Sequence, residues 1–362
     1  MAVDPDSGIE DTPVLPAGIT AQELSGVASW MTNQGLGSGP LSNVNPLGGG
    51  TQNIMLTFER DGRRYVLRRG PSHLRPRSND SIARETRVLS ALQQTSVPHP
   101  HLVALCEDSS LLNGAIFYLM DPIDGFNPSL ELPGMHASDP RLRHEMALNI
   151  VEALAVLGSV DYRHVGLADF GKPAGFLERQ VPRWLSELES YRQFDGYGDP
   201  DIPGVETVAG WLDENRPTSW QPGIMHGDFH SANVMFDRLS PRVAAIVDWE
   251  MSTIGDPLLD LGWLLATWQL PEAPSIFGGV FMESSGLPEP SALVARYAER
   301  SSRDLTSIHW YVVLACFKLG IVLEGTHARA IAGLAPKTTG DELHTTTLRL
   351  FERALQIMDG EQ

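Results

Sequence analysis

Alternating apolar and polar positions in the first third of the chain predict a small, mostly antiparallel sheet. The predicted strands are residues 53–58, 64–68, 102–107 and 115–120. The first two flank Asp61-Gly62, a dipeptide that favours a tight hairpin turn, so we expect them to pair directly. A helix is expected over residues 81–95, after capping residues at 78–80, and a shorter one over residues 22–32.

The pattern changes after Asp121-Pro122, where helical periodicity replaces alternation. Residues 140–160 predict a helix whose apolar side chains fall on one side. Two more helices are predicted at residues 180–191 and 206–215, and the chain from Pro257 onward is largely helical in pattern. The second part of the chain is therefore expected to be mainly helical.

Chain length and these patterns together predict two lobes. A chain of 362 residues is long for a single hydrophobic core. Residues 1–19 contain three prolines and several acids without a periodic apolar pattern, which predicts a flexible tail. We expect residues 20–120 to form a smaller N-lobe and residues 121–362 to form a larger C-lobe.

The composition excludes several classes of protein. A net charge of −18 argues against a nucleic-acid partner or an anionic membrane surface, and it would suit a cationic substrate, although it is more simply explained by solubility. No window contains eighteen uninterrupted apolar residues, so a membrane span is not expected. The acidic N-terminus lacks the features of a secretory signal, and Cys106 and Cys316 have no metal-type spacing. These features predict a reduced, cytoplasmic protein, and they leave its oligomeric state open.

The most informative segment runs from His226 to Val234. Asp228 and Asn233 are five residues apart within it, and a predicted apolar strand over residues 243–247 ends on Asp248. Phosphoryl transfer from Mg-ATP needs one carboxylate to orient a hydroxyl, and an amide with a second carboxylate to hold the metal. Asp228 is therefore the candidate catalytic base, and Asn233 and Asp248 are the candidate Mg²⁺ ligands.

The two histidines of this segment have roles separate from those three residues. His230 lies two residues after Asp228 and could contact the transferred phosphate when it is protonated, or it could only shape the loop. His226 is expected to orient the loop by hydrogen bonding. A simple turn, with Asp228 capping its own backbone, is the structural alternative for the whole segment.

The segment resembles the catalytic set of protein kinases, with Gly227 in place of the arginine that often contacts a phosphorylated activation loop. More closely, the chain resembles the aminoglycoside phosphotransferase-like (choline kinase-like) family, in particular the branch similar to the kinase domain fused to some acyl-CoA dehydrogenases. The matching segments are residues 66–69, 84–89, 117–120, 224–230, 246–250 and 254–261. The resemblance implies an α+β, two-lobed, protein-kinase-like fold, with an antiparallel sheet and a helix in the N-lobe and a mainly helical C-lobe.

The resemblance also implies how ATP would be held. Arg68 stands where the phosphate-holding cation is expected, and Glu85 on the following helix would fix it as an ion pair. Arg69 is the competitor for this role, but strand alternation places it on the opposite face. The glycine-rich segment with Gly49, Gly50 and Thr51 is the candidate phosphate-covering loop.

Three further groups have expected roles. Met120 and Asp121 fall at the expected hinge between the lobes, where adenine would bind to the backbone. Asp256 and Asp260 are expected to brace the catalytic loop or to start the next helix. The aromatic residues Trp184, Trp263, Trp310 and Tyr311 could line a substrate pocket, but they are better explained as core.

These observations predict an ATP- and Mg²⁺-dependent kinase that phosphorylates a hydroxyl of a small molecule. Antibiotic sugars, amino alcohols and hydroxyacyl compounds all remain open as acceptors, and the resemblance favours a hydroxyacyl metabolite. A catalytically silent nucleotide-binding module is the alternative. A hydrolase is disfavoured, because the chain has no Gly-x-Ser-x-Gly segment.

Overall fold

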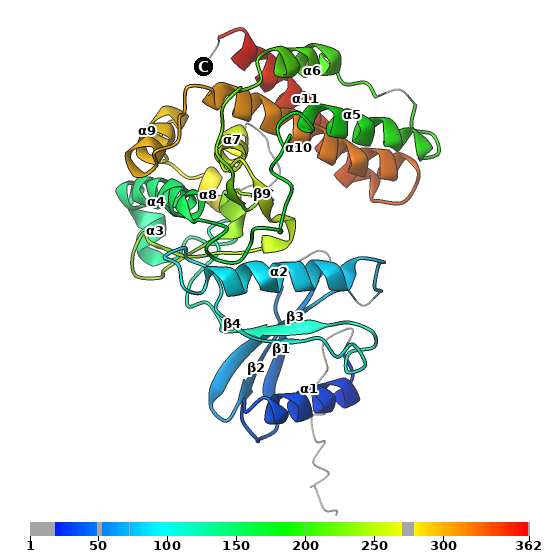
Figure 1. Ribbon diagram of the computed structural model, residues 1–362, viewed down its shortest axis with the longest axis vertical. Coiled ribbons are helices and arrows are strands. Elements are labelled where there is room, and N and C mark those ends of the chain that lie inside the picture. Colours follow the sequence, from blue (N-terminus) through cyan, green and yellow to red (C-terminus); the bar gives the residue numbers. More distant parts are fainter. Residues whose placement is uncertain (1–18, 49–52, 72, 199, 270–278, 361–362) are drawn as a thin grey trace, which may run out of the picture. The chain divides into compact units, whose positions relative to one another are not determined.

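The structure is a computed structural model that describes residues 19–48, 53–71, 73–198, 200–269 and 279–360. The chain divides into two compact units, which are coloured along the sequence in Figure 1. The N-terminal unit is Met1–Arg87 with His101–Pro122, and the C-terminal unit is Val88–Pro100 with Ile123–Gln362. The predicted tail up to residue 18 and the candidate loop residues Gly49, Gly50 and Thr51 lie outside the described residues.

An antiparallel sheet of five strands forms the centre of the N-terminal unit, in the order β1-β2-β3-β5-β4. The strands are β1 (Ser42–Pro46), β2 (Ile54–Arg60), β3 (Arg63–Arg69), β4 (Leu102–Cys106) and β5 (Phe117–Met120). β2 and β3 form the predicted hairpin, because Asp61 and Gly62 at its turn both have positive φ, 49° and 76°. Turns of this kind match the twist of the flanking strands, which explains why the dipeptide predicted the hairpin.

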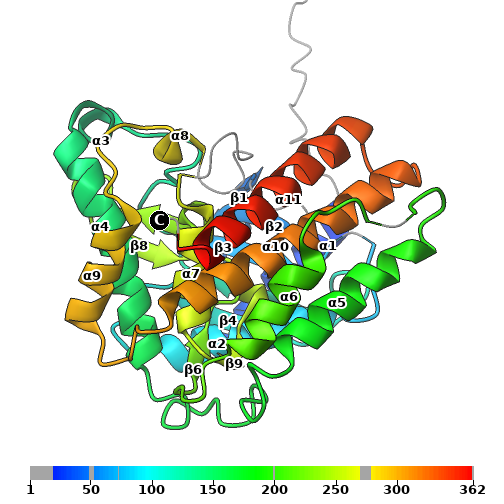
Figure 2. The same cartoon turned by 90° about the horizontal axis from the view of Figure 1, so that it is seen from above.

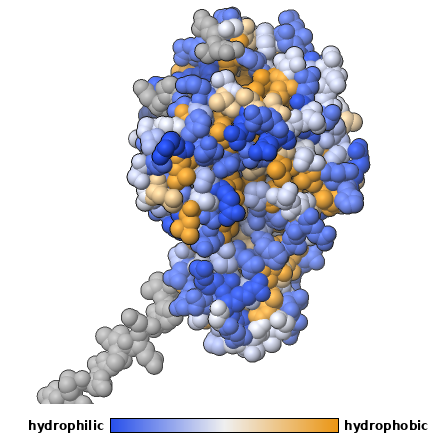
Figure 3. Space-filling model, turned by 90° about the vertical axis from the view of Figure 1, so that its left-hand side faces the viewer, coloured by the Kyte–Doolittle hydropathy of each residue, from blue (hydrophilic) through white to orange (hydrophobic). Residues whose placement is uncertain are grey.

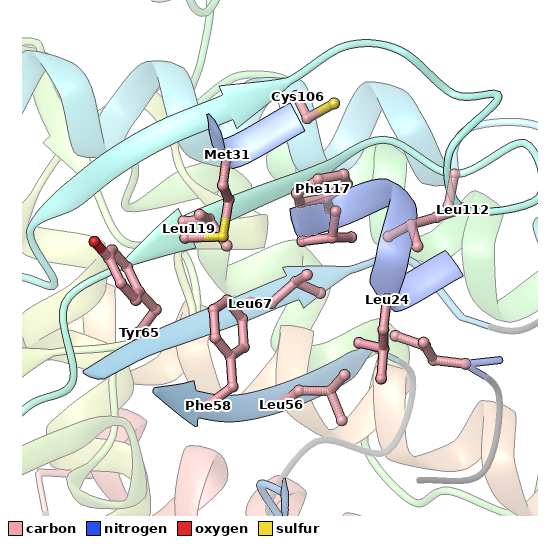
Figure 4. Packing of buried hydrophobic residues seen from close by; sticks show 13 residues of the cluster. Leu24, Met31, Leu56, Phe58, Tyr65, Leu67, Cys106, Leu112, Phe117 and Leu119 are labelled. Carbon is pink, nitrogen blue, oxygen red and sulfur yellow. The ribbon is translucent and has the colours of Figure 1, made fainter. Parts of the chain in front are cut away.

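Helix α1 (Ala21–Asn33) covers one face of this sheet, as Figure 4 shows. Thr20 and Glu23 form a capping box that fixes its first turn. Its buried residues Leu24, Val27 and Met31 pack against apolar side chains of the sheet. These include Leu56, Phe58, Leu67, Phe117 and Leu119. A continuous hydrophobic core therefore lies between α1 and the sheet.

Alternation along β3 sends neighbouring side chains to opposite faces of the sheet. Leu67 joins the core beneath α1, and Arg69 lies on the same side, with its guanidinium 3.9 Å from the Glu23 carboxylate. Arg68 points to the other face, where it meets helix α2 (Ser78–Leu92). This helix begins three residues earlier than predicted, because Ser78 is part of its first turn and accepts a hydrogen bond from the Arg75 N–H.

The C-terminal unit is mainly helical (Figures 1 and 2). Its α-helices are α3 (Gly134–Ser138), α4 (Pro140–Ser159), α5 (Gln180–Ser190), α6 (Val205–Glu214), α7 (Leu258–Thr267), α8 (Gly279–Met282), α9 (Pro290–Arg300), α10 (Ile308–Ile331) and α11 (Lys337–Met358). Three single 3₁₀ turns accompany them: η1 (Tyr191–Gln193), η2 (Ser231–Asn233) and η3 (Trp249–Met251). Two antiparallel strand pairs complete the unit: β6 (Gly223–Met225) with β9 (Thr253–Gly255), and β7 (Val234–Phe236) with β8 (Val243–Ile246).

Helix α10 is the central helix of this unit. It is long and apolar enough to cross a membrane, yet 89% of its apolar window is buried inside the protein, as in the core helix of a globular domain. The aromatic residues that the sequence suggested as core are buried, including Trp310 and Tyr311 on α10 itself. Cys106 and Cys316 are both buried free thiols, as packing residues should be.

On the face drawn in Figure 3, hydrophobic residues are interspersed with hydrophilic ones. Large apolar residues with high exposure, such as Leu130, Leu239 and Leu334, occur singly along the chain. Isolated apolar residues of this kind are normal on a protein surface.

Candidate active site

The segment from His226 to Asn233 connects β6 to β7 in the C-terminal unit, and it includes the turn η2. Gly227 has a φ of 89°, and a Cβ at this position would lie 2.3 Å from the carbonyl oxygen of Met251. No side chain fits so close to a backbone atom at a φ that already favours glycine. The glycine that replaces the kinase arginine is therefore required by the local backbone.

Asp260, near the start of α7, holds the beginning of this loop. Its carboxylate accepts hydrogen bonds from the N–H groups of His226, at 2.6 Å, and Gly227, at 2.8 Å. The side chain is almost fully buried, and burial raises its pKa above the ordinary value despite these two donors. Asp260 thus braces the loop through these two hydrogen bonds, which is one of the two roles expected for it.

Asp256 has the other expected role, because its Oδ1 accepts a hydrogen bond from the Leu258 N–H at 3.1 Å and so caps the start of α7. The hydroxyl of Tyr311 donates to its second oxygen. Burial raises the pKa of Asp256. The carboxylate acts on the helix start and contacts no part of the His226 loop in the described hydrogen bonds.

His226 links the loop to the end of β8. Its Nε2 lies 2.9 Å from the carbonyl oxygen of Val247, and its ring packs edge-on against the buried Trp249 at a centroid distance of 5.0 Å. These contacts fit the orienting role that the sequence suggested. They connect the loop that carries Asp228 to the strand end that carries Asp248.

Asp228, His230 and Asn233 converge within the loop. The amide Nδ2 of Asn233 donates to the backbone oxygen of Asp228 at 2.9 Å and lies 3.3 Å from both the Asp228 Oδ2 and the His230 Nε2. His230 Nε2 is 3.6 Å from Asp228 Oδ2. Because the amide nitrogen faces Asp228, the amide oxygen of Asn233 is the atom left for another ligand.

The pKa of Asp228 is lowered to about 2, although burial alone would raise it. The hydrogen bond and charge of His230, with the charges of His226 and Lys318, outweigh burial. The carboxylate is 36% exposed and ionised at neutral pH. It can therefore accept a hydrogen bond from an approaching hydroxyl.

Asp248 follows β8 at the end where β7 begins. The N–H of Val247 donates to the backbone oxygen of Asn233 at 2.9 Å, so Asn233 and Asp248 flank the same end of the β7–β8 pair. Asp248 has a left-handed backbone, with φ 67° and ψ 63°. A non-glycine residue in this region is strained, and such strain is concentrated at functional sites.

The predicted ion pair between Arg68 and Glu85 is present in the N-terminal unit. Arg68 Nε lies 2.9 Å from Glu85 Oε2, and their side chains are only 8% and 3% exposed. The pair joins β3 to α2. Buried charges of this kind are held in one geometry, because leaving either one unpaired would be strongly destabilising.

Met120 and Asp121 end the sheet of the same unit. Met120 is the last residue of β5, and it pairs with Val66 of β3. The carboxylate of Asp121 contacts Arg63 at 2.8 Å and His101 at 3.0 Å. The side chain of Asp121 is therefore committed to contacts within the unit, and its backbone N–H donates to the carbonyl oxygen of His101 at 3.0 Å.

The sequence reasoning missed Lys318, a buried residue of α10. Its Nζ donates to the carbonyl oxygen of Gly227 at 3.1 Å and lies 4.3 Å from the ring centre of Trp263 and 5.5 Å from that of Trp184. Burial lowers its pKa to about 8, against the opposing charges of Asp228 and Asp260. The available signal was one lysine in the middle of an otherwise apolar helical segment.

Comparison with known proteins identifies relatives by sequence. The phosphotransferase enzyme family matches residues 43–293. The chain is 31% identical over 329 residues to acyl-CoA dehydrogenase family member 11 of Gallus gallus, covering 88% of this chain and 41% of that protein. It is 30% identical over 300 residues to acyl-CoA dehydrogenase family member 10 of Mus musculus, covering 81% and 27%. The chain thus spans less than half the length of these curated relatives.

Solved structures share the fold. A Ralstonia eutropha protein, provisionally assigned as an aminoglycoside phosphotransferase, has a TM-score of 0.76 and 29% identity, with 92% of this chain and 98% of that chain covered. The GDP complex of aminoglycoside 2′-phosphotransferase-IIIa has a TM-score of 0.61 at 17% identity, covering 93% and 99%, and this likeness concerns the fold alone. The resemblance drawn from the sequence is confirmed, and so is the kinase-like α+β fold: this chain belongs to the phosphotransferase enzyme family.

Proposed function

We propose that this protein is a kinase that transfers the γ-phosphate of ATP to a hydroxyl of a small molecule. The observation that carries the proposal is the convergence of Asp228, His230 and Asn233 on one loop, with Asp248 at the adjoining strand end. The family to which the chain belongs supports phosphoryl transfer as the type of chemistry.

Asp228 is proposed to orient the acceptor hydroxyl. Its ionised carboxylate would accept a hydrogen bond from the hydroxyl and take the proton late in the transfer, as phosphorus begins to bond to the oxygen. A pKa of about 2 makes this group a weak base early in the reaction. It therefore acts first by positioning the hydroxyl, and its basicity matters only when the hydroxyl has become strongly acidic.

Asn233 and Asp248 are proposed to hold Mg²⁺. Magnesium prefers hard oxygen ligands and keeps several waters, so one amide oxygen and one carboxylate are a fitting protein contribution. Both side chains are partly exposed, as ligands of a metal that arrives with a nucleotide must be. When bound, the ion would neutralise charge on the phosphate oxygens. His230, beside Asp228, is proposed to contact the transferred phosphate when it is protonated.

Arg68 is proposed to grip phosphate oxygens, with Glu85 holding its guanidinium in place. An arginine stays charged and can bind two oxygens at once, so a rigidly paired Arg68 suits this role. The glycine-rich segment with Gly49, Gly50 and Thr51 is proposed to cover the phosphates through its backbone. The backbone of Met120 and Asp121 is proposed to bind adenine.

A hydroxyacyl compound is the proposed acceptor. The curated relatives are named as acyl-CoA dehydrogenase family members, and this chain corresponds to only a part of their length. That association favours a metabolic acyl compound over an antibiotic sugar. The buried free thiols Cys106 and Cys316 support the further proposal of a reducing, cytoplasmic environment.

The test is ADP release by the purified chain, with Mg-ATP and three panels of acceptors: hydroxyacyl compounds, amino alcohols and aminoglycosides. Turnover with a hydroxyacyl compound, together with loss of turnover in Asp228→Asn, is the expected result. Release of ADP only with aminoglycosides would reject the proposed hydroxyacyl acceptor and support the proposed kinase activity. Nucleotide binding without ADP release from any panel would favour the alternative, a catalytically silent nucleotide-binding module.

A further inference from the structure

A second group of potential metal ligands lies on helices α10 and α11 of the C-terminal unit. An acid precedes a histidine by three residues on each helix: Glu324 and His327 on α10, and Asp341 and His344 on α11. Residues three apart on a helix share one face. The two helices lie side by side in Figure 2, so the two acid–histidine pairs can meet.

Glycine allows the helices to approach closely at this place. A Cβ at Gly340 of α11 would lie 2.3 Å from the Cβ of Ala330 on α10. One ligand atom each from Glu324, His327 and His344 consequently lies within 4.8 Å of the other two. The rings of His327 and His344 are stacked, with centroids 4.4 Å apart.

The carboxylate of Glu324 is buried and already oriented. The hydroxyl of Tyr197 donates to its Oε1 at 2.8 Å, and Nδ1 of His344 lies 2.7 Å from its Oε2. In metal sites a hydrogen bond from an outer residue commonly fixes a ligating carboxylate in this way. An ion bound by Oε2 and the imidazole of His344 would replace the hydrogen bond between them.

His327 supplies an imidazole whose Nδ1 makes no hydrogen bond within the part of the chain that the structure describes. The nearest acidic oxygen is Oδ1 of Asp341, at 3.8 Å. A buried imidazole nitrogen without a hydrogen bond is costly, and a metal or a metal-fixing carboxylate would satisfy it. The side chains of His327 and His344 are 16% and 22% exposed, so an ion can reach them from solvent.

We propose that Glu324, His327 and His344 bind one divalent transition-metal ion, with zinc as the best match. Two imidazoles and one carboxylate suit Zn²⁺ and disfavour Mg²⁺, which prefers oxygen ligands. Zn²⁺ holds such ligands at about 2.0–2.2 Å, which places tetrahedral ligand atoms about 3.4 Å apart. The ligand atoms, which lie within 4.8 Å of one another, would therefore have to draw together by about 1.4 Å at most. Water or Asp341 would complete the four ligands.

The site would stabilise the protein and take no part in phosphoryl transfer. It cross-links the two long C-terminal helices and does not include any residue proposed to act on ATP or the acceptor. An ion that binds only the folded chain adds to the free energy of unfolding by mass action. The inference is thus independent of the proposed kinase function.

The test uses the full chain, stripped of metal with a chelator and then titrated with zinc sulfate by calorimetry in millimolar Mg²⁺. We expect one zinc ion per chain and a rise in melting temperature. His327→Gln and His344→Gln should each weaken zinc binding by at least about tenfold, since even loss of an outer-shell partner costs about 10–100-fold. His309→Gln, an exposed histidine on the same helix α10, is the matched control and should bind as the wild type does.

Absence of zinc binding by the wild type would overturn the proposal, and so would equal binding by His344→Gln. Loss of the zinc in Asp248→Ala, with retention in His344→Gln, would place the ion elsewhere and also overturn it. Cobalt substitution of the wild type needs no variant that might fail to fold. Visible absorption bands of a four-coordinate cobalt ion are expected at one equivalent, and the weak spectrum of hydrated cobalt would contradict the site.

Discussion

At the scale of single residues, two of the charged groups proposed to act on ATP or the acceptor have identifiable partners. Asp228 is kept ionised by His230, with its pKa at about 2, and Arg68 is kept in place by Glu85. The family resemblance implied the second pair, and strand alternation set Arg69 aside by placing it on the opposite face of the sheet. The sequence left two roles open for His230. In the structure its Nε2 lies 3.6 Å from Asp228 Oδ2, which gives the histidine a defined position next to the carboxylate.

Asp228→Asn should abolish turnover and leave nucleotide binding unchanged. The amide cannot accept the proton of the acceptor hydroxyl, and general-base contributions of this kind are worth about 10²–10⁴-fold in rate. The measurement is kcat from ADP release beside the dissociation constant of ATP from calorimetry. A variant that keeps wild-type kcat would remove Asp228 from the proposed mechanism.

Asp248→Ala should lose the stabilisation that Mg-ATP gives to the wild type. Without this carboxylate the ion has lost one of its two proposed protein ligands, so the nucleotide binds weakly and adds little to the free energy of unfolding. Melting curves with Mg-ATP, with ATP in chelator and without nucleotide measure the effect. Glu283→Ala, an exposed acid of the same unit, is the control. An equal Mg-ATP shift in both variants would contradict the metal assignment.

At the scale of elements, the loop from His226 to Asn233 is held by segments that are distant in sequence. Asp260 from α7 accepts two of its N–H groups, Lys318 from α10 donates to the carbonyl of Gly227, and Met251 of η3 closes over the glycine. The family resemblance suggested that Asp260 braces the loop, but no local pattern predicted the contacts of Lys318 and Met251, because they depend on which segments pack behind the loop. They explain how a short loop can hold the proposed catalytic groups in one geometry.

Gly227→Ala should destabilise the protein and reduce turnover. The loss of stability should exceed the cost of placing an alanine at a positive φ alone. The new Cβ would meet Met251 at a φ of 89°, and the strain and clash together should cost about 1–3 kcal/mol or more. Gly166 has a similar φ of 82° with no atom within 4 Å of its ideal Cβ, so Gly166→Ala measures the backbone cost alone. Urea midpoints compare the two. Equal losses would show that the approach of Met251 is unimportant.

Lys318→Met should change how stability depends on pH. Burial lowers the pKa of Lys318 from 10.5 to about 8, so between these values the unfolded chain binds a proton that the folded chain does not. The free energy of unfolding of the wild type, relative to the variant, should therefore rise from pH 8 to pH 10, by about 1–3 kcal/mol. Urea unfolding at both values tests this. Parallel pH profiles would mean that Lys318 has an ordinary pKa.

At the scale of the whole molecule, a net charge of −18 bears on the choice of acceptor. A strongly acidic chain attracts cations and repels anions at low ionic strength, and salt screens both effects. The proposed hydroxyacyl acceptor and a cationic aminoglycoside should therefore respond to salt in opposite ways.

The KM for a hydroxyacyl carboxylate should fall between low and high sodium chloride, measured at saturating Mg-ATP, because screening weakens its repulsion by the acidic chain. The KM for any aminoglycoside that is turned over should rise, because screening removes its attraction to the acidic chain. An uncharged amino-sugar analogue or a neutral hydroxyl compound serves as the reference. A rise in KM for the carboxylate would indicate a locally basic acceptor site that overrides the net charge.

The amino-acid sequence by itself determined the elements and the family of this protein. Strand alternation, the Asp61-Gly62 turn and the order of six short segments depend on neighbouring residues, so they can be read without a fold. The ends of the elements were predicted less accurately: α2 begins three residues before its predicted start.

Only the tertiary structure decided which distant side chains support those elements. Lys318 behind Gly227, and the group of Glu324, His327 and His344, are each assembled from separate segments. Their energies come from burial and from ligand geometry, which exist only after helices have packed. The sequence contains the residue types that such sites need. The packing of α7, α10 and α11 brings these side chains close to one another.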